Sequence, residues 1–214
     1  LVGSEMCIRD RVRSSQEASQ MAAVNNPNVV ASLFDEAAGR DFIDVQMSAL
    51  LPQASVQAQG YRADNSNADG TRFTGGQFTA NVTVPLYQGG SEYATVRAAR
   101  QDASRLRQVV DDQRRTASQQ ATSAWETLVS NRATVEGNRA AIRAAEIALD
   151  GVQRDAVVGS RTPLDVLNQE QELLNNRVAL VQALASNVTS SYSLAAAVGR
   201  LTAKDLALPV QIYD

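Results

Sequence analysis

Residues 157–167, VVGSRTPLDVL, decide the fold because they contain the signals that end one helix and begin another. Gly159 suits the left-handed residue that closes a helix at its carboxyl end. Thr162 suits the N-cap of the following helix, and Pro163 suits its first position. Asp165 lies three residues after Thr162, the spacing of a capping box, although Glu or Gln is more usual there. The segment therefore predicts a sharp reversal between two helices.

The segment before this reversal predicts one very long helix. From Ser91 to about Val157 the chain contains no Pro, and Ala is the commonest apolar residue on the expected helix. At about 1.5 Å per residue such a helix extends for about 100 Å, which is too long for a domain of this size to enclose. It must therefore pack lengthwise on other helices, and periodicity alone does not distinguish a coiled coil from a helical tube.

The segment after the reversal predicts a second helix from Pro163 to about Val198, ended by Gly199. Apolar residues recur along it at three- and four-residue spacings, which is typical of an amphipathic helix. They are Leu164, Leu167, Leu174, Val178, Val181, Leu184, Val188, Tyr192 and Ala195.

Two shorter helical segments open the chain. The patterns cover Ser14 to Ala23 and Pro27 to Leu51, and Asn26 before Pro27 is a helix-start signal. Residues 1–13, LVGSEMCIRDRVR, contain the only Cys and match neither these patterns nor a signal peptide. They resemble translated adapter sequence, so we expect a non-native leader.

Two strand-like runs follow, Ala54 to Ala63 and Gln77 to Tyr87, separated by a loop at 64–76 rich in Asp, Asn and Gly. Both runs match the length of a tilted strand that crosses an outer membrane. An antiparallel strand of a soluble sheet shows the same alternation, and taken alone the runs favour that reading. The second run alternates more sharply, with Phe78, Ala80, Val82, Val84 and Leu86 on one face.

Composition excludes several classes of function. With 20 basic and 23 acidic residues, the formal charge of -3 gives no electrostatic case for nucleic acid as a partner. The absence of His removes the usual general base and most catalytic zinc sites. No stretch approaches the roughly 18 to 20 apolar residues of a transmembrane helix. We expect no enzyme, no metal site and no cofactor.

Four segments, taken in order, resemble the TolC family of outer-membrane efflux and secretion ducts. They are ALLPQASVQAQ at 49–59, VPLYQGG at 84–90, VGSRTPLDVLNQEQELLNNRVAL at 158–180 and AAVGRLTAKDLAL at 196–208. The resemblance covers Ser14 to Asp214. It implies a mainly α fold with a β-hairpin, in which a long antiparallel helical hairpin forms part of an α-barrel and two strands belong to a transmembrane β-barrel.

The resemblance also implies a homotrimer in which each protomer supplies four strands to a twelve-stranded barrel in the cell outer membrane, above a tube of helices in the periplasm. With one strand pair and one long helix, this chain looks like the second half of such a protomer. The implied segments are 14–53 (periplasmic helices), 54–87 (outer-membrane hairpin, with 64–76 extracellular), 88–200 (periplasmic helical hairpin, turning at 158–162) and 201–214 (C-terminal tail).

The implied function is a passive conduit of a tripartite efflux pump or a type I secretion system, with a periplasmic adaptor protein and an inner-membrane transporter as partners. A periplasmic adaptor is the alternative, because it also pairs a helical hairpin with β-structure. Adaptors usually place that hairpin inside a lipoyl-like domain, whereas here the strands precede the helices. An enzyme would need a site, and the carboxylates are scattered along helix surfaces.

The resemblance assigns two groups of site residues. In the family the helical turn narrows the periplasmic entrance and meets the adaptor, and Arg161 and Asp165 match a charged pair that holds it closed. The capping box is an equally good reading of Asp165. Asn168 stands where some members have a second acidic residue, and Ala156 where a gate tyrosine can occur. The turn group is Val158, Gly159, Ser160, Arg161, Thr162, Asp165 and Asn168, and the group facing outer-membrane lipid is Phe78, Ala80, Val82, Val84 and Leu86.

Overall fold

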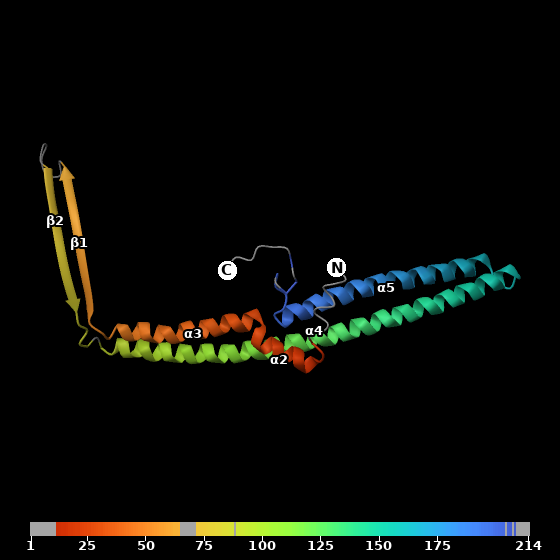
Figure 1. Cartoon of the computed structure of the whole chain (residues 1–214), viewed down its shortest axis with the longest axis horizontal. Helices are drawn as coiled ribbons and strands as arrows, with labels where there is room; N and C mark the ends of the chain where they lie inside the picture. Colours follow the sequence, from red (N-terminus) through yellow and green to blue (C-terminus); the bar gives the residue numbers. More distant parts are fainter. Residues whose placement is uncertain (1–11, 65–71, 88, 204, 207, 209–214) are drawn as a thin grey trace. The chain divides into compact units, whose positions relative to one another are not determined.

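A computed structural model describes residues 12–64, 72–87, 89–203, 205–206 and 208. In this part of the chain two helices, a two-stranded sheet, a long helix and a last helix follow one another (Figure 1). Most of the expected loop, the leader up to residue 11 and most of the tail lie outside the described residues. The chain divides into two compact units, Leu1–Ser32 with Val110–Asp214, and Leu33–Val109.

Helix α4 spans Ser91–Val157 and contains 67 residues, so the prediction of one continuous long helix is confirmed. Gly89 and Gly90, with φ of 68° and 84°, supply the left-handed backbone that precedes it. Ion pairs one turn apart line its exposed surface, among them Arg105 with Asp102 at 2.8 Å. Each such pair stabilises a helix by only about 0.2 to 0.5 kcal/mol, so packing against other helices must supply most of its stability.

Helix α5 spans Pro163–Ala197 and runs antiparallel beside α4 in the first unit (Figure 1). The buried and half-buried residues of α5 include a set that repeats every three and four positions, which is the heptad spacing of a coiled coil. Its members are Val166, Gln169, Leu173, Asn176, Leu180, Ala183, Asn187, Ser190, Leu194 and Ala197. We call this set the inner face of α5.

Hydrogen bonds from α4 fix the register of the two helices. The Nδ2 atoms of Asn131 and Asn138 donate to the carbonyl oxygens of Ser186 and Ala179 at 3.3 and 3.1 Å. The donors are seven residues apart on α4 and the acceptors are seven residues apart on α5, so the two hydrogen bonds are one heptad apart on each helix. Polar residues at such seam positions select one register at some cost in stability.

A hydrophobic cluster lies in the first unit, where α2, Ser15–Asn25, packs with α4 and α5. Val12 is buried in this cluster, and the backbone N–H of Arg13 donates to Glu17 Oε2 at 2.8 Å. These two residues were expected to belong to the leader, and they instead belong to the folded part. The cluster consists of Val12, Ala18, Ala22, Val29, Ala117, Ala121, Leu128, Leu194 and Val198.

The junction between α2 and α3 is tied to the end of α5. Asn26 is buried, its Oδ1 accepts from the N–H of Asn28 at 3.0 Å, and its Nδ2 donates to Ala197 O at 2.9 Å. The predicted N-cap is thus confirmed and also joins two helices. Gly199 follows with φ of 75°, and a Cβ placed there would lie 2.2 Å from Asn25 O. Only glycine fits this approach.

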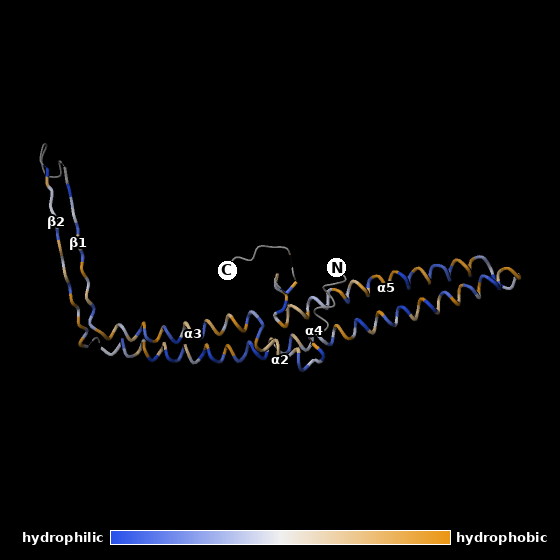
Figure 2. The backbone as a smooth tube through the Cα atoms, in the orientation of Figure 1, coloured by the Kyte–Doolittle hydropathy of each residue, from blue (hydrophilic) through white to orange (hydrophobic). Residues whose placement is uncertain are grey.

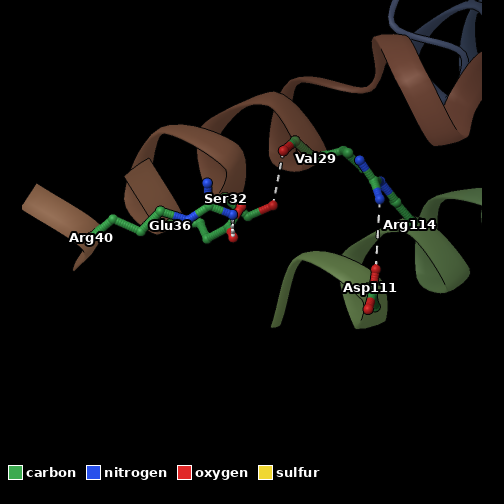
Figure 3. Close-up of polar contacts among 6 residues, drawn as sticks. All are labelled: Val29, Ser32, Glu36, Arg40, Asp111 and Arg114. Atoms are coloured by element: carbon green, nitrogen blue, oxygen red, sulfur yellow. Dashed lines mark hydrogen bonds and ion pairs between the residues drawn. The ribbon is translucent and has the colours of Figure 1, made fainter. Parts of the chain in front are cut away.

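Helix α3 spans Pro27–Ser48, three residues shorter than predicted, and ends in single turns before Pro52. In the second unit its Gly39 faces α4, because a Cβ there would lie 2.4 Å from Leu106 Cδ1. The polar contacts drawn in Figure 3 are local to one helix each: Ser32 Oγ with Val29 O, Arg40 with Glu36, and Arg114 with Asp111. They support the helices individually rather than joining them.

Strands β1, Gln53–Asp64, and β2, Arg72–Thr83, pair antiparallel over twelve residues without a bulge. Strand β2 starts five residues earlier and ends four residues earlier than predicted. The early start follows from pairing across the hairpin, which holds the Gly75–Gly76 segment in the strand despite its turn-like composition. The early end follows from Pro85, which has no N–H to donate to a ladder.

Within the described residues, no helix is both long enough and apolar enough to cross a membrane. Figure 2 shows apolar and polar residues alternating along the helices and strands. Apolar residues are therefore interspersed with polar residues rather than gathered in long continuous runs.

Candidate functional site

The turn between α4 and α5 is closed by hydrogen bonds that cap both helices. Gly159 has φ of 79°, its N–H donates to Ala156 O at 3.1 Å, and the N–H of Ser160 donates to Asp155 O at 3.0 Å. This pair of bonds is the Schellman pattern that satisfies the last carbonyls of a helix. The hydroxyl of Ser160 donates to the same Asp155 carbonyl at 2.9 Å. The turn is therefore well ordered by its own backbone.

Asp165 and Thr162 form the predicted capping box. The N–H and the hydroxyl of Thr162 each donate to Asp165 Oδ2 at 2.9 Å, and the N–H of Asp165 donates to Thr162 Oγ1 at 3.3 Å. The backbone bond from Thr162, then its hydroxyl bond, hold the pKa of Asp165 below its ordinary value, and the charge of Arg161 adds a smaller effect in the same direction. The capping role of this carboxylate is confirmed.

Arg161 projects from the middle of the turn and is exposed. In the part of the chain that the structure describes, no carboxylate lies within 4.0 Å of its guanidinium. Asn168 is exposed one turn after Asp165 on α5, and Ala156 is half-buried in the last turn of α4. The structure thus places the two predicted gate residues, Arg161 and Asp165, near each other without a direct ion pair.

Apolar side chains surround the turn. Val158 is the one apolar residue among them that the predicted turn group contains. Val157 and Val158 are 88% and 78% exposed, and Leu164 and Leu167 are 64% and 60% exposed. Four large aliphatic residues at the end of a helical hairpin form a surface that a partner could cover.

Most of the apolar stripe predicted on α5 faces away from α4, but two of its predicted members do not: Ala195 is buried and Tyr192 is half-buried. Leu173 is buried while the adjacent Leu174 is 54% exposed, and Val181 is 66% exposed beside the inward Leu180. Successive residues differ by about 100° around a helix, so α5 has two apolar seams on different sides. We call the exposed seam the outer stripe of α5; its members are Leu164, Leu167, Leu174, Val178, Val181, Leu184 and Val188.

The β-hairpin also has two chemically different faces. Residues directly opposite in an antiparallel pair lie on the same side, so pairs such as Val56 with Ala80 and Gln57 with Thr79 assign every residue to a face. The apolar face contains Ala54, Val56, Ala58, Phe78, Ala80 and Val82. The polar face contains Gln53, Ser55, Gln57, Gln59, Gln77, Thr79, Asn81 and Thr83.

The structure places only part of the expected lipid-facing group on one face of the hairpin. Phe78 and Val82 are 74% and 71% exposed on the apolar face and are joined by Val56 from the other strand. Val84 and Leu86 lie beyond the last pair of the ladder, so the structure does not place them on this face.

The chain matches a known family over most of its length. The sequence profile described as "Outer membrane efflux protein" matches residues 18–200. Over 204 residues the chain is 35% identical to the outer membrane efflux protein BepC of Brucella suis biovar 1, which covers 94% of the chain and 44% of that protein. Over 210 residues it is 27% identical to the outer membrane protein TolC of Vibrio cholerae, covering 90% and 45%. The chain spans less than half the length of these relatives.

Solved structures show the same fold. The Campylobacter jejuni CmeC outer membrane channel superposes with a TM-score of 0.70 at 16% identity, covering 94% of this chain and 44% of that one. The Neisseria gonorrhoeae MtrE outer membrane channel gives a TM-score of 0.69 at 17% identity, covering 85% and 41%. With a helical hairpin, a two-faced β-hairpin and a profile match over 18–200, the chain belongs to the outer membrane efflux protein family, and its location is the outer membrane.

Proposed function

We propose that this chain forms part of a passive duct across the outer membrane, assembled as a homotrimer and extended by a tube of helices into the periplasm. The duct performs no chemistry on what it carries. It works with a periplasmic adaptor protein and an inner-membrane transporter in efflux or type I secretion. A periplasmic adaptor is not favoured, because the family match is to outer-membrane proteins.

The observation that carries this proposal is the outer stripe of α5. A helix in a simple two-helix hairpin needs one apolar seam, whereas α5 has an inner face covered by α4 and a second seam exposed to solvent. A helix in a closed tube has a neighbour on each side and needs two seams. Burial of each Val or Leu of the stripe by another helix would contribute roughly 1.5 to 3 kcal/mol.

The two-faced hairpin supports the same assembly. A two-stranded sheet is marginally stable in water, and both of its edges lack further strands within the described residues. Each strand has twelve residues, and about 9 to 11 cross a bilayer when tilted. In a barrel the apolar face would contact lipid and the polar face would line the lumen.

The turn between α4 and α5 suits the entrance of such a duct. Its backbone is held by two caps, while Arg161 and the aliphatic residues Val157, Val158 and Leu164 are exposed. The apolar residues supply contact area for an adaptor protein. An Arg161 contact with a neighbouring protomer at this exposed rim would be worth only about 0.2 to 1 kcal/mol, which biases the entrance toward closure without locking it.

Assembly through the outer stripe can be tested with one pair of variants. Val181→Asp places a charge in the stripe, and Gln182→Asp places the same charge on the adjacent exposed position. Native mass spectrometry of the detergent-extracted protein should show trimers for the wild type and for Gln182→Asp, and a reduced trimer fraction for Val181→Asp. Equal trimer fractions for both variants would contradict the assignment of this stripe to an interface.

A further inference from the structure

The β-hairpin changes character at a pair of opposed glycines. Gly60 lies directly opposite Gly76, and the pairing continues without a bulge on both sides of them. Toward the loop, Arg62 and Arg72 fall on the side of the apolar face, whereas Tyr61 and Phe73 fall on the side of the polar face. The two aromatic residues therefore lie on the face opposite Val56 and Val82.

Tyr61 and Phe73 form one aromatic surface. Their ring centroids are 5.7 Å apart with an interplanar angle of 25°, which is a stacked arrangement. The ring of Tyr61 also covers Gly75, because a Cβ at that glycine would lie 2.5 Å from Tyr61 Oη. The absence of a side chain at Gly75 allows the ring to lie across the strand. The side chains nevertheless remain open to solvent, with Tyr61 42% and Phe73 59% exposed.

The side of the hairpin that holds this pair offers few other means of binding. From Gln53 to Gln59 and from Gln77 to Thr83, the polar face contains only amide and hydroxyl side chains and no charge. A passing molecule would find no ionic contact on this stretch. Aromatic faces attract planar apolar groups by stacking and cations through the ring quadrupole.

Membrane barrels commonly place aromatic residues on the lipid side as interfacial girdles. That role does not fit this pair, because regular one-to-one pairing fixes Tyr61 and Phe73 on the same side as Gln57 and Thr79. Stacking over Gly75 would stabilise the hairpin end, but it does not require that both rings stay accessible.

We infer that Tyr61 and Phe73 form a contact site for exported molecules with planar aromatic or cationic groups, on the lumenal wall at the loop end of the barrel. This inference rests on the proposed duct, in which the polar face lines the lumen. Three protomers would supply six rings from this hairpin, arranged around the path of the exported molecule. The site selects by ring stacking and cation–π attraction rather than by net charge.

Current block of the assembled channel in a planar lipid bilayer tests this inference, with ethidium as a planar aromatic cation added on the loop side. The double variant Tyr61→Leu with Phe73→Leu keeps apolar volume and removes both rings, and its block should be about two- to five-fold weaker, the factor produced by loss of an exposed cation–π contact. Tyr61→Phe retains the ring and should block like the wild type. Phe78→Leu removes a ring from the apolar face and is the matched control, with block unchanged.

The outcomes separate this inference from the duct itself. Normal conductance with unchanged ethidium block in the double leucine variant would overturn the aromatic site and leave the duct intact. A weaker block in Phe78→Leu equal to that in the double variant would also overturn it. Absence of any channel from the wild-type protein would overturn the duct and the aromatic site together.

Discussion

Gly159 and Gly199 provide a test in which backbone conformation is held constant and steric surroundings differ. Both close a helix in the left-handed region, with φ of 79° and 75°. An alanine at either position incurs the left-handed penalty, about 1 to 2 kcal/mol. At Gly159 an added Cβ meets nothing within 4 Å, whereas at Gly199 it would lie 2.2 Å from Asn25 O and 2.7 Å from Asn25 C.

The contact at Gly199 involves backbone, which cannot rotate away as a side chain would. Overpacking of this kind typically costs a further 1 to 3 kcal/mol. We therefore expect Gly159→Ala to lower the free energy of unfolding by about 1 to 2 kcal/mol, and Gly199→Ala by about 2 to 5 kcal/mol. The second variant should also disturb the Asn26 to Ala197 hydrogen bond, because Asn25 must shift.

Denaturant unfolding of the assembled protein, followed by tryptophan fluorescence, measures both variants. Trp125 packs against the hydrophobic cluster of the first unit, close to the elements that Gly199 joins. Equal losses of stability in the two variants would refute the argument from steric contact. A larger loss for Gly159→Ala would refute the described packing of the α2–α3 junction on the end of α5.

Three further predictions concern the turn and the hairpin. Asp165→Ala should destabilise the assembled protein more than Asp165→Asn, as measured by thermal unfolding. Because the folded pKa of Asp165 lies below its ordinary value, its stabilisation is present above that ordinary pKa and is lost as the pH falls through the folded pKa, so the stability difference between wild type and Asp165→Asn should shrink in strong acid. A difference that stays constant would contradict the ionised cap. Arg161→Glu should raise single-channel conductance with trimer stability nearly unchanged, and unaltered conductance would remove Arg161 from the gate. Val82→Arg should make the free energy of membrane insertion less favourable by about 2 to 4 kcal/mol, whereas Thr83→Arg should chiefly change conductance. Equal insertion of the two variants would contradict the two-faced hairpin.

Local signals predicted the turn and the long helix well. Gly159, Thr162 and Pro163 act through their own backbone and their nearest neighbours, so their effects can be identified from the sequence. The start of β2 at Arg72 could not be predicted in this way, because it depends on pairing with residues near Asp64. Val12 was likewise missed, because only tertiary contacts show that it is buried.

The stripe on α5 shows where periodicity stops being informative. The large aliphatic residues at Leu174, Val178 and Val181 gave a clear pattern, but the residues that pack on α4 are a more polar set including Asn187 and Ser190. Five of the seven outer-stripe residues directly follow a residue of the inner face, so the two patterns overlap in a single helix. The sequence pattern identified the more apolar set of residues. Only the structure shows that α4 covers the more polar set.

The central claim is that the hairpin separates lipid from a water-filled lumen, and thiol accessibility at two adjacent residues tests it most directly. Asn81 and Val82 lie on opposite faces of β2. In channels assembled in a lipid bilayer, a membrane-impermeant charged thiol reagent should modify Asn81→Cys and lower the conductance, and should leave Val82→Cys unmodified. Modification of Val82→Cys with Asn81→Cys protected, or equal modification of both, would contradict the account.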